Sequence, residues 1–332
     1  MEIEDLTVFI AGCGSIGRRH AGVLKGMGVH SLILFDPRRE VAYALAKELN
    51  ASVADSFEDG ISMGCHAVYV LSPTALHVKQ AAAAIEKGKP VFIEKPLSHS
   101  MEGVEELRAL QRQTGRIAAV GFCFRFHPGI RRAKAIVDSG EIGRVVSIRA
   151  LMGEHFPDMR PDYLSTYCVK YSGAFELIHD LDLALWFAGK PMLRSESYWG
   201  SFASLGFESP DTAEIILDFG DSLASVHLDF FQSPRRRQFE VMGTEGTVTV
   251  EFADWNAFTV RLFTRKSGCW KEESSTTSRN TMFELQSREF LNAILHGSGV
   301  TCTLEEGKKS LEVYSSVYAD KAAMDMEAKA CG

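Results

Sequence analysis

The stretch Val8–His20 (VFIAGCGSIGRRH) limits the possible folds of this chain more than any other part of the sequence. It opens with a short apolar run, which is typical of a buried parallel strand. Gly12, Gly14 and Gly17 follow in G-x-G-x-x-G spacing, and a helical pattern comes next. In such a turn the first glycine permits a tight exit from the strand. The second lets a pyrophosphate approach the backbone, and the third lets the helix pack closely on the strand.

The N–H groups at the start of that helix, predicted at residues 17–28, are expected to face the phosphates of a dinucleotide, and Ser15 and Ile16 are predicted to contact the cofactor too. Such glycines can also form a turn without a ligand. The strand before the turn, the helix after it and an acidic residue at the end of the next strand favour a cofactor site. We therefore interpret this segment as the phosphate-binding turn of a dinucleotide-binding domain.

The acidic residue is Asp36, which closes a predicted strand at Ser31–Phe35, roughly 20 residues beyond the glycines. A carboxylate there accepts hydrogen bonds from the adenosine ribose hydroxyls and repels a 2′-phosphate. This favours NAD over NADP. Arg38 and Arg39 follow directly, and an arginine is the side chain that a 2′-phosphate would need, so NADP stays an alternative. The other interpretation of the two arginines is a solvated loop.

The first 120 residues alternate predicted strands and helices, which indicates a doubly wound parallel sheet with helices on both faces. Ligands of such sheets bind at the carboxyl ends of the strands. Gly12, Asp36, Pro73 and Lys95 all follow strand ends, so we expect them at one crevice. The further predicted strands are Ala67–Leu71, Pro90–Ile93 and Ile117–Val120, and the helices are Val41–Asn50, His77–Gly88 and Ser98–Thr114.

After Gly121 the pattern changes to longer segments in which polar and apolar residues alternate, such as TAEIILDF and RQFEVMG. That period indicates antiparallel strands with one covered face. We predict an α+β domain with a large, mostly antiparallel sheet at residues 123–302, after a Rossmann domain at 1–122. A terminal helix at about 303–330 is expected to pack back on the first domain.

Composition excludes several classes of protein. The chain has 332 residues and a net charge of -7, which argues against a nucleic-acid partner. No apolar run approaches the length of a membrane span, and the start, MEIEDL, lacks the pattern of a signal peptide. The seven cysteines form no C-x-x-C pair, which indicates reduced thiols in a cytoplasmic protein without a zinc site.

Three residues are candidates for proton and charge handling. Lys95 precedes a proline that restricts its backbone, and an ammonium at the crevice stabilises a developing alkoxide. His179 and Glu176 are three residues apart on a predicted helix within Gly173–Phe187, so they are expected to share a face, as in an oriented general base. The alternatives are a surface lysine and a surface histidine with an acidic neighbour. No second histidine cluster supports a metal ion.

The stretch Gly153–Tyr167 is dense in polar and aromatic residues without periodicity, which fits a loop that binds a polar ligand such as a sugar. An ordinary solvated loop is the alternative. Asp180 is expected to flank the site, and Asp182 is expected to be structural. The residues predicted to contact substrate are Arg125, His155, Asp158, Arg160, Tyr163 and Asp180.

Together these motifs resemble the glucose–fructose oxidoreductase / inositol dehydrogenase / rhizopine catabolism (Gfo/Idh/MocA) family. The resemblance rests on GCGSIG at 12–17, SPTALH at 72–77, Glu94-Lys95-Pro96, GFCFRFHP at 121–128 and GAFELIHDLD at 173–182. It implies a Rossmann domain, a second domain with a large sheet, and homodimers or homotetramers built through that sheet. The implied activity is NAD(P)-dependent oxidation or reduction of a sugar or polyol hydroxyl.

The resemblance also implies roles for particular residues. Lys95 matches the family's catalytic lysine and His179 its proton-transfer histidine. The residues expected to line the cofactor from the two short motifs are Ser72, Pro73, Thr74, His77, Glu94 and Lys95. Many members carry an aspartate four residues before the histidine, where this chain has Phe175, and the acid here is Glu176. That variant resembles a branch linked to bacterial surface-sugar synthesis.

The sequence thus predicts a hydride transfer between a nicotinamide and a secondary hydroxyl of a sugar, amino sugar, nucleotide sugar or polyol, placed between the two domains. In this hypothesis His179, supported by Glu176, takes the hydroxyl proton, and Lys95 stabilises the oxyanion. The alternative is a non-catalytic, NAD-responsive regulator on the same fold, a case that the resemblance includes in the yeast galactose-regulon repressor.

Overall fold

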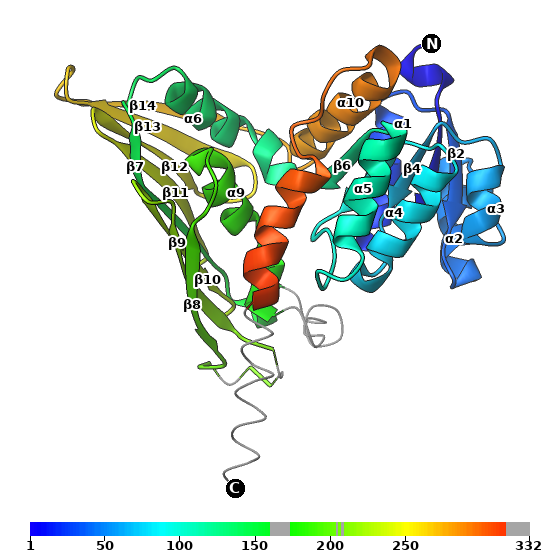
Figure 1. Cartoon of the computed structure of the whole chain (residues 1–332), viewed down its shortest axis with the longest axis horizontal. Coiled ribbons are helices and arrows are strands. Elements are labelled where there is room, and N and C mark those ends of the chain that lie inside the picture. Colours follow the sequence, from blue (N-terminus) through cyan, green and yellow to red (C-terminus); the bar gives the residue numbers. More distant parts are fainter. Residues whose placement is uncertain (160–172, 204, 207–208, 317–332) are drawn as a thin grey trace, which may run out of the picture. The chain divides into compact units, whose positions relative to one another are not determined.

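The computed structural model describes residues 1–159, 173–203, 205–206 and 209–316, and the chain packs into two units (Figure 1). The first unit is Met1–Cys123 with Asn280–Glu312, and the second contains the described residues of Phe124–Arg279 together with residues 313–316. The predicted boundary assigned residues 280–302 to the second domain. In the structure this segment belongs to the first unit, because its helix buries an apolar face there.

A six-stranded parallel sheet in the order β3-β2-β1-β4-β5-β6 forms the centre of the first unit. β1 lies between β2 and β4, with Ala11 beside both Phe35 and Val70, so the carboxyl ends of these strands align. This is the strand order of a dinucleotide-binding fold. The strands are β1 (Thr7–Ala11), β2 (Ser31–Phe35), β3 (Ser52–Val53), β4 (Ala67–Val70), β5 (Val91–Glu94) and β6 (Ala118–Gly121).

Helices follow most of these strands, as the alternation predicted. The predicted ones are α1 (Ser15–Gly26), α2 (Arg39–Leu49), α4 (His77–Glu86) and α5 (Val104–Thr114). α3 (Phe57–Ser62) and α10 (Thr281–His296), which comes from much later in the chain, were not predicted, nor were the short 3-10 helices η1 (Ile3–Asp5), η2 (Thr74–Leu76) and η3 (Cys123–Phe126). α10 packs beside α1, and its Phe290 and Leu291 are fully buried in the same core as the strands. The chain is helical again at 304–316, where the terminal helix was predicted; the predicted continuation beyond 316 lies outside the described residues.

The second unit contains an eight-stranded sheet in the order β14-β13-β12-β11-β7-β10-β9-β8. Only the β7–β10 pair is parallel among its seven neighbouring pairs. The strands are β7 (Val145–Gly153), β8 (Arg194–Gly200), β9 (Thr212–Asp218), β10 (Leu223–Asp229), β11 (Arg236–Gly243), β12 (Gly246–Phe252), β13 (Ala257–Thr264) and β14 (Trp270–Thr276).

One face of this sheet is covered by α6 (Pro128–Asp138), which packs on β12 and β13, and by α9 (His179–Ala188), which packs on β7 and β10 (Figure 1). The unit also contains α7 (Phe156–Met159) and η4 (Gly173–Leu177). The predicted fold class, a Rossmann domain followed by an α+β domain with a mostly antiparallel sheet, is confirmed. The strands β3, β8, β13 and β14 were not predicted individually.

Candidate active site

The glycine turn between β1 and α1 has three geometrically different positions. Gly12 has φ +103°, and a Cβ there would lie 2.4 Å from the carbonyl oxygen of Leu71. A Cβ on Gly17 would lie 1.9 Å from the carbonyl oxygen of Gly12, so the helix can pack on the turn only without a side chain there. A Cβ on Gly14 would have no described atom within 4 Å. The turn is therefore closed by Gly12 and Gly17 and open at Gly14, as a pyrophosphate site requires.

The start of α1 fits the same ligand. The helix begins at Ser15 with Gly14 as its N-cap, so the capping residue has no side chain to accept from the first N–H groups. Those N–H groups, with the helix dipole behind them, favour an anion. Cys13 lies inside the turn, and burial raises the pKa of its thiol to about 12, with Asp36 adding to the effect. It is a neutral filler rather than a reactive thiol.

Asp36 lies at the carboxyl end of β2, and its buried carboxylate faces the glycine turn. Its Oδ2 accepts a hydrogen bond from the Cys13 N–H at 2.9 Å, and its Oδ1 accepts one from the Arg38 N–H at 3.0 Å. The exposed Arg38 guanidinium is 3.4 Å from the same oxygen. Each carboxylate oxygen has two lone pairs, so acceptor capacity is left for ribose hydroxyls. The geometry fits the predicted adenosine-ribose role.

The SPTALH segment and the E-K-P segment are connected through the buried His77 side chain. Its Nε2 is 2.9 Å from the carbonyl oxygen of Ser72, and its Nδ1 is 2.9 Å from the carbonyl oxygen of Pro96. Burial lowers the pKa of His77, while the two carbonyl contacts act in the opposite direction. Ser72 also donates from Oγ to Gln80 at 2.6 Å. Pro73 and Thr74, with exposed and half-buried side chains, begin η2 beside it. His77 thus holds the Lys95–Pro96 loop against the end of β4.

Glu94 is the last residue of β5, and the half-buried Lys95 follows it. The Lys95–Pro96 peptide bond is cis. A Cβ on Gly121, in the neighbouring strand β6, would lie 2.6 Å from Glu94 Oε2, so the glycine makes space for that carboxylate. On its other side Glu94 Oε2 is 3.6 Å from Nε2 of His20, a fully buried residue of α1 that the sequence analysis missed.

In the second unit, the predicted helix that carries Glu176 and His179 is divided into two consecutive segments of different helix type. Glu176 belongs to the 3-10 helix η4, whereas His179 is the first residue of α9, with Ile178 as its N-cap. The backbone of Ile178 is itself helical, with φ -53° and ψ -12°. Both side chains are half-buried. The His179 ring contacts Phe124, with 5.0 Å between ring centroids.

Two predicted substrate-binding residues, Asp180 and Arg125, lie instead in buried ion pairs. Arg237 donates two hydrogen bonds to Asp180, from Nε at 3.2 Å and Nη2 at 2.7 Å. Arg125 donates two to Asp182, from Nε at 2.8 Å and Nη2 at 2.7 Å. Burial raises the pKa of Asp180, and Arg237 opposes that shift. These carboxylates and guanidinium groups therefore anchor α9, and the structural role expected of Asp182 extends to Asp180 and Arg125.

Arg237 was missed, although the sequence carried a signal for it. In the strand RRQFEVMG it alternates with Phe239 and Val241, so it lies on the apolar face, where a charge needs a partner. Two further cationic side chains of this unit contact one tryptophan ring. The Arg235 and Arg279 guanidinium groups lie 4.6 Å and 4.4 Å from the Trp255 ring centroid, and Arg235 Nε donates to the buried Glu154 at 3.2 Å.

The loop predicted to bind a polar ligand is described only in part. His155 Nδ1 forms an ion pair with Asp158 Oδ2 at 2.7 Å, and both side chains are accessible. Arg160 and Tyr163 lie outside the described residues. Across the described segments, no group of three or more histidine, cysteine or acidic residues could hold a metal ion. Within the same residues, no helix has the length and apolar character to cross a membrane.

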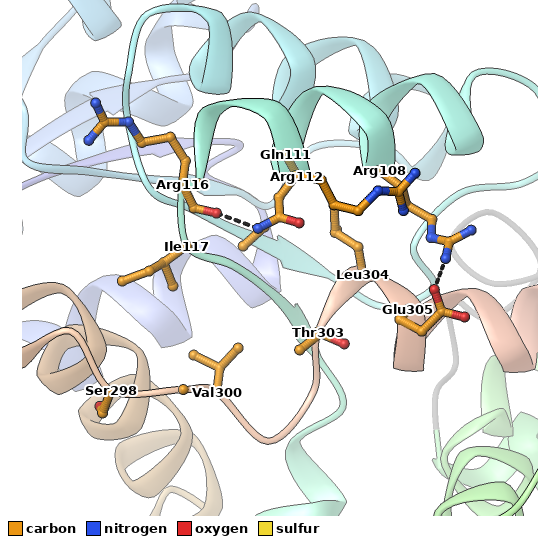
Figure 2. Close-up of a pocket in the computed structure, with 13 residues that line it drawn as sticks. Arg108, Gln111, Arg112, Arg116, Ile117, Ser298, Val300, Thr303, Leu304 and Glu305 are labelled. Carbon is orange, nitrogen blue, oxygen red and sulfur yellow. Dashed lines mark hydrogen bonds and ion pairs between the residues drawn. The ribbon is translucent and has the colours of Figure 1, made fainter.

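A cavity of about 370 Å³ in the first unit lies at the amino end of β6 (Figure 2). α5 contributes Arg108, Gln111 and Arg112 to its wall, and Thr303 and Glu305 face them from the start of the 304–316 helix. Gln111 Nε2 donates to the carbonyl oxygen of Arg116 at 2.7 Å, and Arg108 forms an ion pair with Glu305. None of the predicted site residues lines this cavity.

Comparison with known families gives two matches that together follow the chain. Residues 6–122 match the oxidoreductase family model GFO_IDH_MocA, described as an NAD-binding Rossmann fold. Residues 130–249 match the GFO/IDH/MocA C-terminal domain. The two matched regions correspond to the parallel sheet of the first unit and to the strands β7–β12 of the second.

Individual relatives agree with these matches. Myo-inositol dehydrogenase Hyg17 of Streptomyces leeuwenhoekii is 30% identical over 68% of this chain and 66% of that protein, just under two thirds of its length. The scyllo-inositol 2-dehydrogenase (NAD(+)) of Bacillus subtilis is 29% identical over 73% of this chain and 72% of that protein. Among solved structures, a levoglucosan dehydrogenase in complex with NADH and levoglucosan has a TM-score of 0.83 at 19% identity, covering 96% and 97% of the two chains.

Proposed function

Because the chain belongs to the Gfo/Idh/MocA oxidoreductase family, we propose that it is a dehydrogenase that uses NAD to oxidise a secondary hydroxyl of a polyol or sugar, or to reduce the corresponding ketone. The observation that carries the proposal is the combination of an open Gly14 turn, a buried Asp36 and the Lys95 loop at the carboxyl ends of β1, β2 and β5 in one parallel sheet. Two sequence relatives named as inositol dehydrogenases support a polyol as the substrate class.

The first unit provides the residues that would hold the cofactor. The Gly14 turn and the start of α1 receive the pyrophosphate, and Asp36 receives the adenosine ribose. Ser72, Pro73, Thr74 and His77 form the loop after β4 in the position proposed for the nicotinamide side. NAD, when bound, supplies a nicotinamide carbon that accepts or returns a hydride.

The proposed chemistry of the protein is proton and charge handling. In the oxidation direction the proton of the substrate hydroxyl moves to the His179 imidazole. The carbon that bears this hydroxyl loses its hydrogen as a hydride to the nicotinamide, so that a ketone remains. The Lys95 ammonium stabilises the negative charge that develops on the substrate oxygen. In the reverse direction His179 returns the proton. Glu176 is proposed to orient His179.

The test is NADH formation, followed by absorbance, with purified protein and a panel of inositols, free sugars, amino sugars and nucleotide-linked sugars. We expect turnover with one class. Lys95→Met is expected to lower kcat by about a hundredfold or more, while NAD binding measured by calorimetry stays near the wild-type affinity. Near-normal turnover in this variant would overturn the role of Lys95. NAD binding without turnover on any member of the panel would favour the regulator alternative.

A further inference from the structure

Two buried ion pairs attach α9 to the second unit, directly after His179. Asp180 pairs with Arg237 of β11, and Asp182 pairs with Arg125 of η3. In both pairs the side chains are at most 3% exposed, and in both the arginine donates two hydrogen bonds to one carboxylate. Such paired charges are tolerated in an interior because each hydrogen-bonding group is matched. As anchors of the helix, the two pairs are equivalent.

They differ in the aromatic ring that each guanidinium contacts. The Arg237 Cζ is 3.4 Å from the centroid of Phe124, whereas the Arg125 Cζ is 5.3 Å from the centroid of Trp186. Phe124 also contacts His179, with 5.0 Å between centroids. Arg237 therefore connects to His179 by two routes, through the Phe124 ring and through Asp180, the next residue in the chain.

We propose that Arg237 is a positioning residue for the His179 imidazole. Its planar guanidinium, held by Asp180, packs on the Phe124 ring and so restricts the position of the ring that His179 contacts. The inference rests on the proposed function, in which His179 moves the substrate proton. Proton transfer depends on the direction and distance of the imidazole, so a loosened Phe124 reduces the productive fraction of the enzyme even when the fold is intact.

The two ion pairs also differ in how the loss of the carboxylate charge would affect His179. Among the charged and titratable side chains nearby, Arg235 acts on Asp180, and His127 stacks on the Phe124 ring and feels the charge of Arg237. Removing the Asp180 charge takes one negative charge away from the surroundings of Arg237 and His179, and the more positive surroundings disfavour the imidazolium. The corresponding change at Asp182 leaves a cation beside Trp186.

The test compares Asp180→Asn with Asp182→Asn, because both changes remove one charge from an equivalent buried pair. We expect similar losses in melting temperature. We expect kcat to fall about tenfold or more in Asp180→Asn alone, with the KM for NAD unchanged, and the acid limb of its pH–rate profile to move to lower pH. Equal kcat and equal profiles in the two folded variants would overturn the proposal.

A second pair of variants covers the case in which a charge variant does not fold. Phe124→Leu and Phe252→Leu each remove a ring that Arg237 contacts, with 3.4 Å and 5.5 Å between Arg237 Cζ and the ring centroid. Of these two rings, only that of Phe124 contacts His179 among the described residues. We expect a drop in kcat for Phe124→Leu that is at least several times larger than that for Phe252→Leu. Equal drops would contradict the proposed route.

His179→Asn separates this inference from the proposed function. If His179→Asn retains turnover, the proposed proton transfer fails. If His179→Asn abolishes turnover while Asp180→Asn and Asp182→Asn behave alike, the function stands and Arg237 is only structural. Arg237→Lys keeps the charge toward Asp180 without the planar group over Phe124, so we expect it to restore stability relative to Arg237→Met but not kcat.

Discussion

The backbone N–H of Cys13 donates a hydrogen bond to Asp36 Oδ2 at 2.9 Å, which connects the glycine turn after β1 to the end of β2. The contact joins the proposed phosphate site to the proposed ribose site. A change at Asp36 can therefore affect both the shape of the turn and the charge that a ribose meets. The first prediction separates these two effects.

Asp36→Asn keeps a side-chain oxygen that can accept from the Cys13 N–H, but it removes the negative charge. We expect the ratio of kcat/KM for NAD to that for NADP to fall by about tenfold, because a charge-assisted hydrogen bond to the ribose is lost and a 2′-phosphate is no longer repelled. Melting temperature should change little. An unchanged cofactor ratio would contradict the role proposed for the carboxylate.

Gly14→Ala and Gly17→Ala form a matched pair in the same turn. A methyl group at Gly14 enters open space, so we expect a normal melting temperature and a KM for NAD raised by about tenfold through conflict with the pyrophosphate. A methyl group at Gly17 meets the Gly12 carbonyl oxygen at 1.9 Å, so we expect a loss of about 1–3 kcal/mol in unfolding free energy. Thermal melting and calorimetric titration with NAD check both. A destabilised Gly14→Ala protein would contradict the geometry.

His127 makes the unfolding free energy depend on pH in the acid range. Its pKa is lowered from 6.5 to about 3 by burial and by Arg237, so below about pH 6.5 the unfolded chain binds a proton that the folded chain does not. Stability is therefore lost as the pH falls. His127→Asn preserves an acceptor for the Gly129 N–H that His127 Nδ1 binds at 3.2 Å. In urea unfolding, we expect the free energy of unfolding of wild type to exceed that of His127→Asn by less and less as the pH falls below 6.5. A constant difference would exclude this linkage.

His227 gives the opposite dependence. Hydrogen bonds with Asp229 and Glu214 raise its pKa from 6.5 to about 9, against the effect of partial burial. Because the folded protein holds this proton more tightly, the stabilisation is complete below pH 6.5 and is lost as the pH rises through 9. We expect His227→Gln to be less stable than wild type near neutral pH and nearly equal to it above pH 9. An equal deficit at every pH would exclude the charged form as the cause.

Local patterns in the sequence predicted the parts of the fold that depend on near neighbours. The glycine spacing, the buried strand before it and Asp36 after the next strand were sufficient for the Rossmann fold class, because all three lie within one short strand–helix–strand segment. The alternation in TAEIILDF and RQFEVMG likewise predicted antiparallel strands. Local patterns could not assign α10 to the first unit. Its apolar face packs on the α1 side of that core, but the residues of the second unit separate α10 from α1 in the sequence.

For the site, the sequence by itself determined which residue types are present at strand ends: the open Gly14, Asp36, Glu94 and Lys95. Only the tertiary structure decided which charges face each other. Arg237 and Asp180 are 57 residues apart, as are Arg125 and Asp182, so no local period links them. The helix type also changes between Glu176, in η4, and His179, in α9, within a sequence pattern that reads as one helix. Burial makes such long-range pairing necessary, because a charge removed from water requires a partner wherever the fold supplies one.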